Sequence, residues 1–354
     1  METKNNIAIL IPTKNRAEFV IRQLHYYTSV RSQYPVYIGD SSNSEHSLKI
    51  QKAIEQMKGA LTVHYFCKPE FNYCKTTIHL LSLVKEEYIC MIGDDDFQIP
   101  SSLEKCAEFL DTHKDYASAH GNAVAIRIMN NAVYGKIGKI KDYPQPQCEQ
   151  NSANDRVLNF FNQYYVSHFS VVRAEVMKKA WSRWAETPER SFSEEMLDAT
   201  LIVVMGKSKL LDCLSFIRQI HDQHYLLPNT FDWITSSGWD ANYLAFQKIV
   251  TEEITKKDNI SQDTAQASVR EAFWSYLQKW LALDYQTHMS KHYPRIAHPT
   301  MKEKIKKYLY FLMPMYKIIK PYVKKKRWIH AEVVNPSSPY YKDFKAVKYI
   351  IENI

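Results

Sequence analysis

Three consecutive carboxylates have the residue types and the close spacing that a chemical role requires. The segment MIGDDDFQIP, residues 91–100, places Asp94, Asp95 and Asp96 directly behind a short apolar run. Like charges at this spacing repel one another, so the cluster needs a stabilising partner. One such partner is the start of a helix, where Asp is favoured as an N-cap. Another is a divalent ion such as Mg²⁺ or Mn²⁺, which prefers carboxylate oxygens and often shares them with substrate phosphates.

Two further groups of polar residues lie in the second half of the chain. The run SFSEEMLDATLIVVMGK places Glu194 and Glu195 in the first turn of an expected helix, where acids also stabilise the helix dipole. The run FIRQIHDQH follows an expected strand and supplies Arg218, His221 and His224. The arginine could neutralise phosphate charge, and either histidine could donate to phosphate, ligate a metal or be purely structural.

Alternating strands and helices must position these side chains. Apolar spacing predicts helices over residues 17–29 and 45–58, and a third helix with Ile78, Leu81 and Val84 on one face. This order predicts right-handed βαβ units, a parallel sheet and helices on both faces. Ligands of such sheets bind outside the carboxyl ends of the strands, which is where the acidic triplet falls. The expected strands cover residues 7–12, 36–38, 61–66 and 88–92.

Size and composition place the chain among ordinary globular proteins. A length of 354 residues is enough for about two domains. The six cysteines show no C-x-x-C pair and no regular spacing, which argues against a disulfide framework and a cysteine zinc site. No run approaches the roughly 20 apolar residues that span a bilayer, and residues 1–6 lead directly into a strand pattern rather than a signal peptide. We therefore expect a cytoplasmic protein.

The net charge of +8 comes from one segment near the C-terminus. Residues 302–327 hold ten Lys or Arg and one Glu, so the rest of the chain is close to neutral. Apolar residues of 301–330 recur at spacings of three and four between the lysines, which is typical of a basic helix in an anionic membrane interface. A surface helix packed on the body is the alternative. We expect no nucleic-acid partner, because the basic residues form no groove with stacking aromatic residues.

The first half of the chain resembles the GT-A glycosyltransferases, in particular the large inverting family-2 group. The resemblance is carried by three segments in order, AILIPTKNRAEFV, YIGDSSN and MIGDDDFQIP. Members of this family typically have a first strand ending in Pro-x-x-Asn, a second ending in Asp-Asp-Gly-Ser, and an Asp-x-Asp motif followed by a proline. The resemblance covers roughly residues 5–225. It implies an α/β fold with a mostly parallel, Rossmann-like sheet and flanking helices, followed by a helical C-terminal region.

The family resemblance assigns roles to residues of the first half. Pro12, Thr13 and Arg16 match positions that line the nucleotide pocket, and Asp40 matches the acid that reads the base. The two neighbours of Asp40 depart from the family pattern. Residues 94–96 match the metal motif, whose carboxylates hold a divalent ion against the donor diphosphate, and the first of them also counts as a donor contact. Three aspartates in a row leave open which two form the Asp-x-Asp pair.

In the second half, the resemblance points to a catalytic base. Family members carry Glu-Asp followed by Gly eleven residues later, and the interval from Glu195 to the next glycine matches this spacing. Glu195 therefore takes the place of the base, with Glu194 beside it. An inverting transfer needs one carboxylate to accept the proton of the acceptor hydroxyl as its oxygen attacks the anomeric carbon. Relatives often have Arg and His near the diphosphate, which is the place of Arg218, His221 and His224.

These features predict a metal-dependent inverting glycosyltransferase. It would move a sugar from a nucleotide diphosphate, a UDP-sugar first of all, to a hydroxyl of a glycan or lipid-linked acceptor in bacterial surface polysaccharide synthesis. Residues 1–225 would form the catalytic GT-A domain, 226–300 a helical acceptor-side region, and 301–354 a basic tail that binds the inner face of the cell membrane. One alternative is a sugar nucleotidylyltransferase, although the loop PTKNRAE lacks the glycines of that class. The other is a non-catalytic adaptor for membrane or polyanion.

Overall fold

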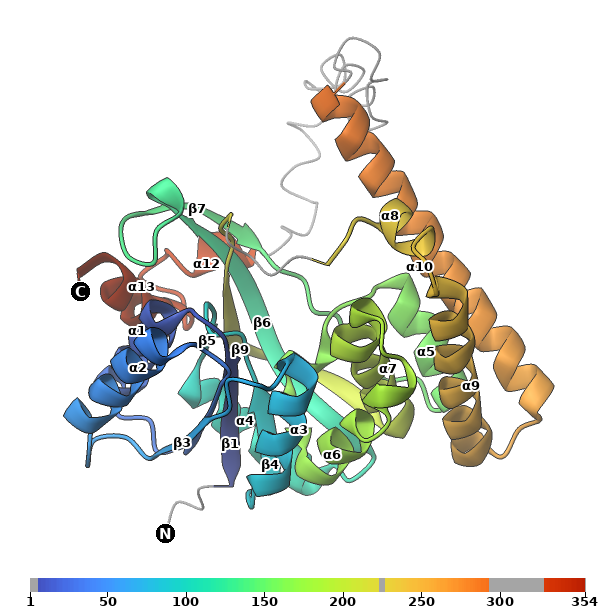
Figure 1. The fold of residues 1–354 in the computed structure, drawn as a ribbon, viewed down its shortest axis with the longest axis horizontal. Coiled ribbons are helices and arrows are strands. Elements are labelled where there is room, and N and C mark those ends of the chain that lie inside the picture. The colour runs from blue at the N-terminus through green and yellow to red at the C-terminus, as the bar shows by residue number, and fades with distance from the viewer. Residues whose placement is uncertain (1–5, 223–226, 293–327, 354) are drawn as a thin grey trace.

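The computed structural model describes residues 6–222, 227–292 and 328–353 (Figure 1). Its first hundred residues alternate between strand and helix, as the apolar spacing predicts. Four strands run parallel in the spatial order β3-β2-β1-β4. The elements of this half are β1 (Ile7–Thr13), α1 (Ala17–Ser29), β2 (Val36–Asp40), α2 (Ser44–Gln56), β3 (Val63–Cys67), α3 (Tyr73–Leu83) and β4 (Tyr88–Met91).

The sheet continues beyond β4 with strands of mixed direction. The strand β8 runs antiparallel to both β4 and β6, while β6 and β9 run parallel to one another. The full order is β3-β2-β1-β4-β8-β6-β9-β5, with β7 paired to β6, so the expected α/β sheet is confirmed and is mixed at this side. The added strands are β5 (Phe97–Gln98), β6 (Tyr116–Ile128), β7 (Ile137–Asp142), β8 (Val171–Arg173) and β9 (Lys207–Gln219).

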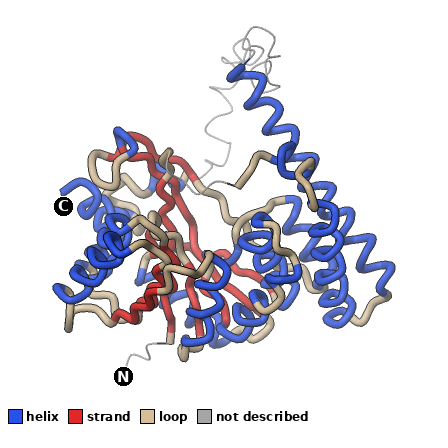
Figure 2. Tube along the Cα trace, viewed as in Figure 1, coloured by secondary structure: helices blue, strands red, loops and turns tan. Residues whose placement is uncertain are grey.

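Helices cover both faces of the sheet, each over its own apolar core (Figure 2). The alternation of side chains along β1 shows the division, because Ala8 and Leu10 enter one core while Ile9 and Ile11 enter the other. One face carries α1, α4 (Pro100–Thr112) and α13 (Tyr341–Asn353). The opposite face carries α3, α5 (Ala153–Asn162), α6 (Ala174–Trp181) and α7 (Leu197–Met205).

A helical region follows the sheet, as expected for the residues after 226. It consists of α8 (Thr230–Ile234), α9 (Trp239–Asp258) and the long α10 (Gln262–His292). Ala265, Val269 and Phe273 of α10 are buried against the core that α5 and α9 share. The far end of α10 extends past the body of the molecule (Figure 1). None of the helices in the described ranges combines the length and apolar character that a membrane span requires.

The C-terminal residues pack against the strands β6 and β7 and against the helix α1. The short α12 (Ile329–Glu332) lies beside β6 and β7, and α13 packs next to α1 (Figure 1). Phe344, Val347 and Ile351 of α13 are buried in the same core as α1. The backbone N–H of Gly135 donates to the carbonyl of Ile351 at 2.8 Å. The basic segment 302–327, with its expected amphipathic helix, lies outside the described residues.

Candidate active site

A cavity of about 380 Å³ lies outside the carboxyl ends of β1 and β4. This is the edge at which a parallel α/β sheet binds its ligands. Residues from β1, the β4–β5 turn, the Phe192–Met196 turn and β9 meet there, although Pro12 and Arg218 are more than 200 positions apart in the sequence. Nine residues predicted from sequence line this one cavity: Pro12, Thr13, Arg16, Asp94, Asp95, Asp96, Glu194, Glu195 and Arg218.

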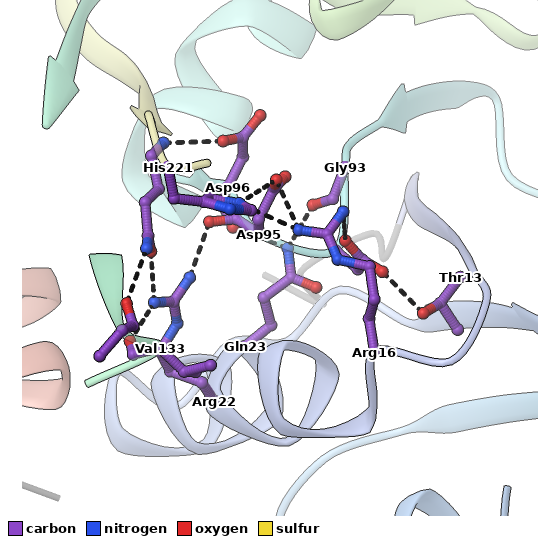
Figure 3. A network of polar contacts seen from close by, with 12 residues as sticks. Thr13, Arg16, Arg22, Gln23, Gly93, Asp95, Asp96, Val133 and His221 are labelled. Carbon is purple, nitrogen blue, oxygen red and sulfur yellow. Dashed lines mark hydrogen bonds and ion pairs between the residues drawn. The ribbon is translucent and has the colours of Figure 1, made fainter. Parts of the chain in front are cut away.

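The acidic triplet faces a cation supplied by the chain itself (Figure 3). Thr13 Oγ1 donates to Asp94 Oδ2 at 2.7 Å. The guanidinium of Arg16 then bridges two carboxylates, with Nη1 2.9 Å from Asp94 Oδ1 and Nη2 2.8 Å from Asp95 Oδ2. All three aspartates are buried, so these contacts offset part of a large desolvation cost.

Two polar side chains of α1 fix the backbone of the acidic turn. Arg22 Nη2 donates to the carbonyl of Asp95 at 2.7 Å. Gln23 Nε2 donates to the carbonyls of Gly93 and Asp96, both at 2.7 Å (Figure 3). Both side chains are fully buried, so they hold the turn from inside the protein. Neither residue is predictable from the sequence, because a polar residue in the middle of an amphipathic helix gives no signal of its distant partner.

The helix-capping explanation of the triplet does not hold in this structure. Helix α4 begins at Pro100, its N-cap residue is Ile99, and no side chain makes a capping hydrogen bond there. The aspartates instead line the cavity and contact residues of β1, α1 and β9. Their placement at the sheet edge is therefore a feature of the site and not of the following helix.

The triplet carries strongly perturbed acidities. Burial raises the pKa of Asp94 to about 7, although the nearby Arg16 guanidinium opposes the shift. Burial, together with the charge of Asp95, raises the pKa of Asp96 well above its usual range. Asp96 Oδ1 accepts the backbone N–H of Gln219 at 2.8 Å, while its second oxygen makes no hydrogen bond to the described residues. A cation that approached this oxygen would relieve the cost of the buried charge.

The donor set of the cavity fits a divalent ion that is shared with a substrate. Within the described ranges, no three side chains of His, Cys, Asp or Glu converge into a complete protein metal site. Mg²⁺ and Mn²⁺, however, commonly take one or two carboxylates and complete their coordination with phosphate oxygens and water. Asp96, with its unused oxygen, and the adjacent acids supply this kind of ligand.

The basic residues after β9 take different positions. Arg218 lies on the cavity wall and its Nη1 donates to the Tyr143 hydroxyl at 2.6 Å. His221 is buried behind the triplet, with Nε2 2.8 Å from Asp95 Oδ2 and its ring stacked on Phe19. In this arrangement His221 orients Asp95. His224 lies outside the described residues, so its predicted metal contact has no counterpart here.

Asp40 does not line the cavity, unlike the other residues that are predicted to bind the nucleotide-sugar donor. Its Oδ1 accepts the backbone N–H of Ser42 at 2.8 Å, and its Oδ2 accepts the hydroxyl of Tyr65 at 2.6 Å. These bonds fix the turn that follows β2. Ser41, the next residue, does line the cavity, together with Asn72 and Thr76 of the α3 start. A contact between Asp40 and the base of the nucleotide stays a prediction.

The two predicted glutamates lie on a π-helical turn, Phe192–Met196, at the start of α7. Turns of this kind often mark functional positions, because they re-aim side chains within a helix. Arg190 Nε lies 3.3 Å from Glu194 Oε2. Glu195 instead accepts the hydroxyl of Tyr164 at 3.1 Å, and burial raises its pKa while nearby His168 opposes the shift. A raised pKa of this kind suits a carboxylate that accepts a proton.

A buried histidine and aspartate pair also belongs to this wall. His168 Nδ1 lies 2.5 Å from Asp198 Oδ2, and His168 lines the cavity. Asp198 follows Glu195 by three residues, so both carboxylates lie on one side of the same helix. The sequence alone does not indicate this position for His168, since a single histidine in YVSHFS is as typical of a packed core.

Comparisons with known proteins agree with this geometry. Residues 8–181 match the model of the family described as glycosyl transferase family 2. The chain carries a family-2 glycosyltransferase domain. The expected enzyme class is thereby confirmed, and the match supports glycosyl transfer from a nucleotide sugar. A comparison with curated protein sequences finds no match.

Two solved structures are similar to this chain at low sequence identity. Residues 1–349 of S. aureus TarS, in complex with UDP-GlcNAc, are 15% identical with a TM-score of 0.52, over 81% of this chain and 76% of that one. The mannosyltransferase PcManGT from Pyrobaculum calidifontis, in complex with GDP-Man and Mn²⁺, is 10% identical with a TM-score of 0.42, over 97% of this chain and 85% of that one. The first likeness supports the GT-A fold of this glycosyltransferase.

Proposed function

We propose that this glycosyltransferase transfers a sugar from a nucleotide diphosphate to a hydroxyl acceptor, with inversion at the anomeric carbon and with the help of Mg²⁺ or Mn²⁺. One observation supports this best: the acidic triplet, Arg218 and Glu195 line a single cavity. Groups suited to a diphosphate and a group suited to a hydroxyl proton thus lie around the same space. A UDP-sugar is the first donor to test, because the TarS structure was obtained with UDP-GlcNAc.

The residues of the cavity divide the chemistry between them. Glu195 accepts the proton of the acceptor hydroxyl while that oxygen forms its bond to the anomeric carbon and the bond to the diphosphate breaks. The hydroxyl of Tyr164, 3.1 Å from Glu195 Oε1, orients the carboxylate. Asp94, Asp95 and Asp96 would hold the divalent ion, with Asp96 as the main ligand. When bound, the ion neutralises charge on the leaving diphosphate. Arg218 adds positive charge on the same wall.

Calorimetry with UDP and Mn²⁺ tests the metal-dependent donor site. The full-length protein should bind UDP in the presence of Mn²⁺, and binding should disappear with a chelator or in Asp96→Ala, because both remove the bridge between carboxylate and diphosphate. Asp240→Ala, which removes an exposed acid at the start of α9, is the control and should bind normally. UDP affinity that is indifferent to chelator and to Asp96→Ala would rule out the metal.

The acceptor and the cellular setting belong to the same proposal. A glycan or lipid-linked acceptor at an anionic membrane surface would suit the basic residues 302–327, which could bring the enzyme to the inner face of the cell membrane. Bacterial surface polysaccharide synthesis is the setting that fits such an acceptor. A screen of nucleotide sugars for slow hydrolysis would identify the donor first, because hydrolysis needs no acceptor.

A further inference from the structure

A second cavity, of about 720 Å³, adjoins the first. Glu195 and Arg218 line both cavities, so the carboxylate assigned as the base stands between them. The second cavity is built from segments that are distant in sequence: the residues after β7, those after α5, and the middle of α10. The helical region therefore supplies one of its walls.

Four aromatic side chains line the second cavity. Tyr143, Tyr164 and Tyr165 line it from the sheet side, and Trp280 lines it from α10. A sugar ring carries C–H groups on its flat sides and hydroxyl groups at its edge. The flat side is therefore apolar and packs well against an aromatic ring. The charged lining residues balance one another, since Asp142 and Glu195 are matched by Arg218 and Lys279. This balance favours an uncharged ligand.

Unpaired polar atoms point to hydrogen bonds that a ligand would complete. Gln145 is only 5% exposed, and neither its amide nitrogen nor its amide oxygen has a hydrogen-bond partner among the described residues. The buried indole Nε1 of Trp280 likewise has no partner among them. A buried amide without partners costs about 1–3 kcal/mol, so its presence in a cavity wall needs an explanation. An amide that both donates and accepts suits the neighbouring hydroxyls of a sugar.

We propose that this second cavity binds the acceptor as a neutral sugar ring, stacked on its aromatic walls, with hydrogen bonds from Gln145 and Trp280. The inference rests on the proposed function, because it places an acceptor hydroxyl next to Glu195. It adds the chemical class of the acceptor and the residues that select it. The ring would occupy the second cavity with its reactive hydroxyl at the junction of the two cavities, beside Glu195, so that the carboxylate accepts the proton while the oxygen forms its bond to the anomeric carbon and the diphosphate leaves.

Binding to a panel of neutral 4-nitrophenyl glycosides tests the acceptor site. The full-length Glu195→Gln variant is used so that no turnover occurs, and saturation-transfer NMR with a titration gives Kd. At least one glycoside should bind, and Gln145→Leu and Trp280→Ala should each weaken it by about tenfold or more. The glycoside affinity of Trp280→Phe should lie between those of the parent and of Trp280→Ala, since this variant keeps an aromatic face and loses the N–H. Trp274→Ala is the matched control, because Trp274 lies on the same helix but is 66% exposed and away from this cavity.

Stability and UDP binding separate this inference from its alternatives. Gln145→Leu should keep or raise the melting temperature, because it removes an unpaired buried amide, and UDP affinity should stay within about twofold of the parent. A lower melting temperature with unchanged glycoside affinity would assign Gln145 a structural role and overturn the inference. If UDP binds but no glycoside does, the acceptor inference fails and the donor site stands. If UDP does not bind either, the proposed function itself fails.

Discussion

Glu195 is the residue on which the proposed chemistry of the site depends. Glu195→Gln keeps the shape of the side chain and its contact with Tyr164, but an amide cannot accept the hydroxyl proton. We expect a loss of turnover of about a hundredfold or more, with unchanged UDP affinity by calorimetry. Glu194→Gln is the matched control, because Glu194 lies next to Glu195 but pairs with Arg190, at 3.3 Å. If Glu195 is the base, the Glu194→Gln variant should retain most of the activity.

The pH profile gives a second readout of the same residue. A general base must be ionised, so activity falls as the pH drops through the pKa of Glu195. Burial raises that pKa, so the acidic limb of kcat should lie above the usual Glu range near about 4.3. An acidic limb at the ordinary pKa of Glu, or normal turnover in Glu195→Gln, would show that another residue is the general base.

Arg16 takes the part of a cation between Asp94 and Asp95, and its removal should expose their repulsion. The guanidinium lies within 2.9 Å of both carboxylates. Removing one partner of such a largely buried group costs about 3 kcal/mol. We expect Arg16→Ala to lower the melting temperature without metal, and added Mn²⁺ to restore part of the loss. Thermal denaturation with and without Mn²⁺ measures both effects.

The pH dependence of this loss follows from the pKa of Asp94, which burial raises to about 7. Between about pH 4 and 7 the folded protein holds a proton that the unfolded chain has released, so this group destabilises the fold as the pH rises. Arg16 limits the effect, and Arg16→Ala should therefore lose more stability at pH 8 than at pH 5.5. Arg127→Ala, which breaks an exposed pair with Asp222, is the control. Equal losses at the two pH values would contradict the electrostatic role of Arg16.

At the scale of residues, the sequence predicted the groups that follow strands and missed the groups that support them. Asp94, Asp95 and Asp96 were identifiable because a strand end is a local feature, and the sheet edge then fixes where they meet. The interactions of Arg22 and Gln23 with the acidic turn depend on contacts between residues that are 70 and 73 positions apart. No spacing rule along the chain encodes such contacts.

At the scale of elements, the helix that carries Glu195 depends on a carboxylate that precedes it. Glu189 accepts the backbone N–H of Ser191 at 3.0 Å, the N–H of Phe192 at 3.4 Å and the indole N–H of Trp233 at 2.8 Å. It thus caps the start of the helix and ties it to α8. A cap of this kind contributes about 0.5–2 kcal/mol and fixes where the helix begins.

Glu189→Ala should therefore lower kcat more than it changes the donor KM. The variant loses the cap, so the Phe192–Met196 turn and its catalytic carboxylate become less well positioned, while the donor contacts of β1 and β4 remain. Steady-state kinetics separate the two constants. Glu189→Gln, which retains an acceptor oxygen, should recover much of the activity. Glu186→Ala, three residues earlier and exposed, should behave as the parent does. An unchanged kcat in Glu189→Ala would show that the cap does not position Glu195.

The prediction of elements succeeded where apolar periodicity is clear. The predicted strands and helices of residues 7–92 are confirmed, because each strand is a short run of large apolar residues and each helix has one apolar face. The strand β6, YASAHGNAVAIRI, was not assigned. It consists largely of small residues, and most of its positions are buried on both faces, so it shows no alternation. Its neighbour β7 is mostly half-exposed and polar, and gives no clear pattern either.

At the scale of the whole molecule, the last described helix, α13, packs beside α1, the first helix of the chain. Residues 331–354 contain no motif that indicates a role, yet α13 buries Phe344, Val347 and Ile351 in the same core as α1. Its apolar spacing is that of an ordinary amphipathic helix, and only the fold reveals which surface it covers. Removal of everything after residue 300 would therefore remove core residues along with the basic segment. A test of membrane binding needs a milder change.

Charge neutralisation within the basic segment meets this requirement. Lys→Gln replacements at 302, 304, 306, 307, 317 and 320 remove six charges and keep α13 in place. Each lysine near anionic lipid contributes about 1 kcal/mol, so the affinity for phosphatidylglycerol vesicles, measured by co-sedimentation, should fall by more than about a hundredfold. Six exposed lysines of the body, at 49, 52, 58, 248, 256 and 257, provide the matched control. If both variants bind the vesicles equally well, or if the parent binds phosphatidylcholine vesicles as tightly, an electrostatic membrane anchor in residues 302–327 is excluded.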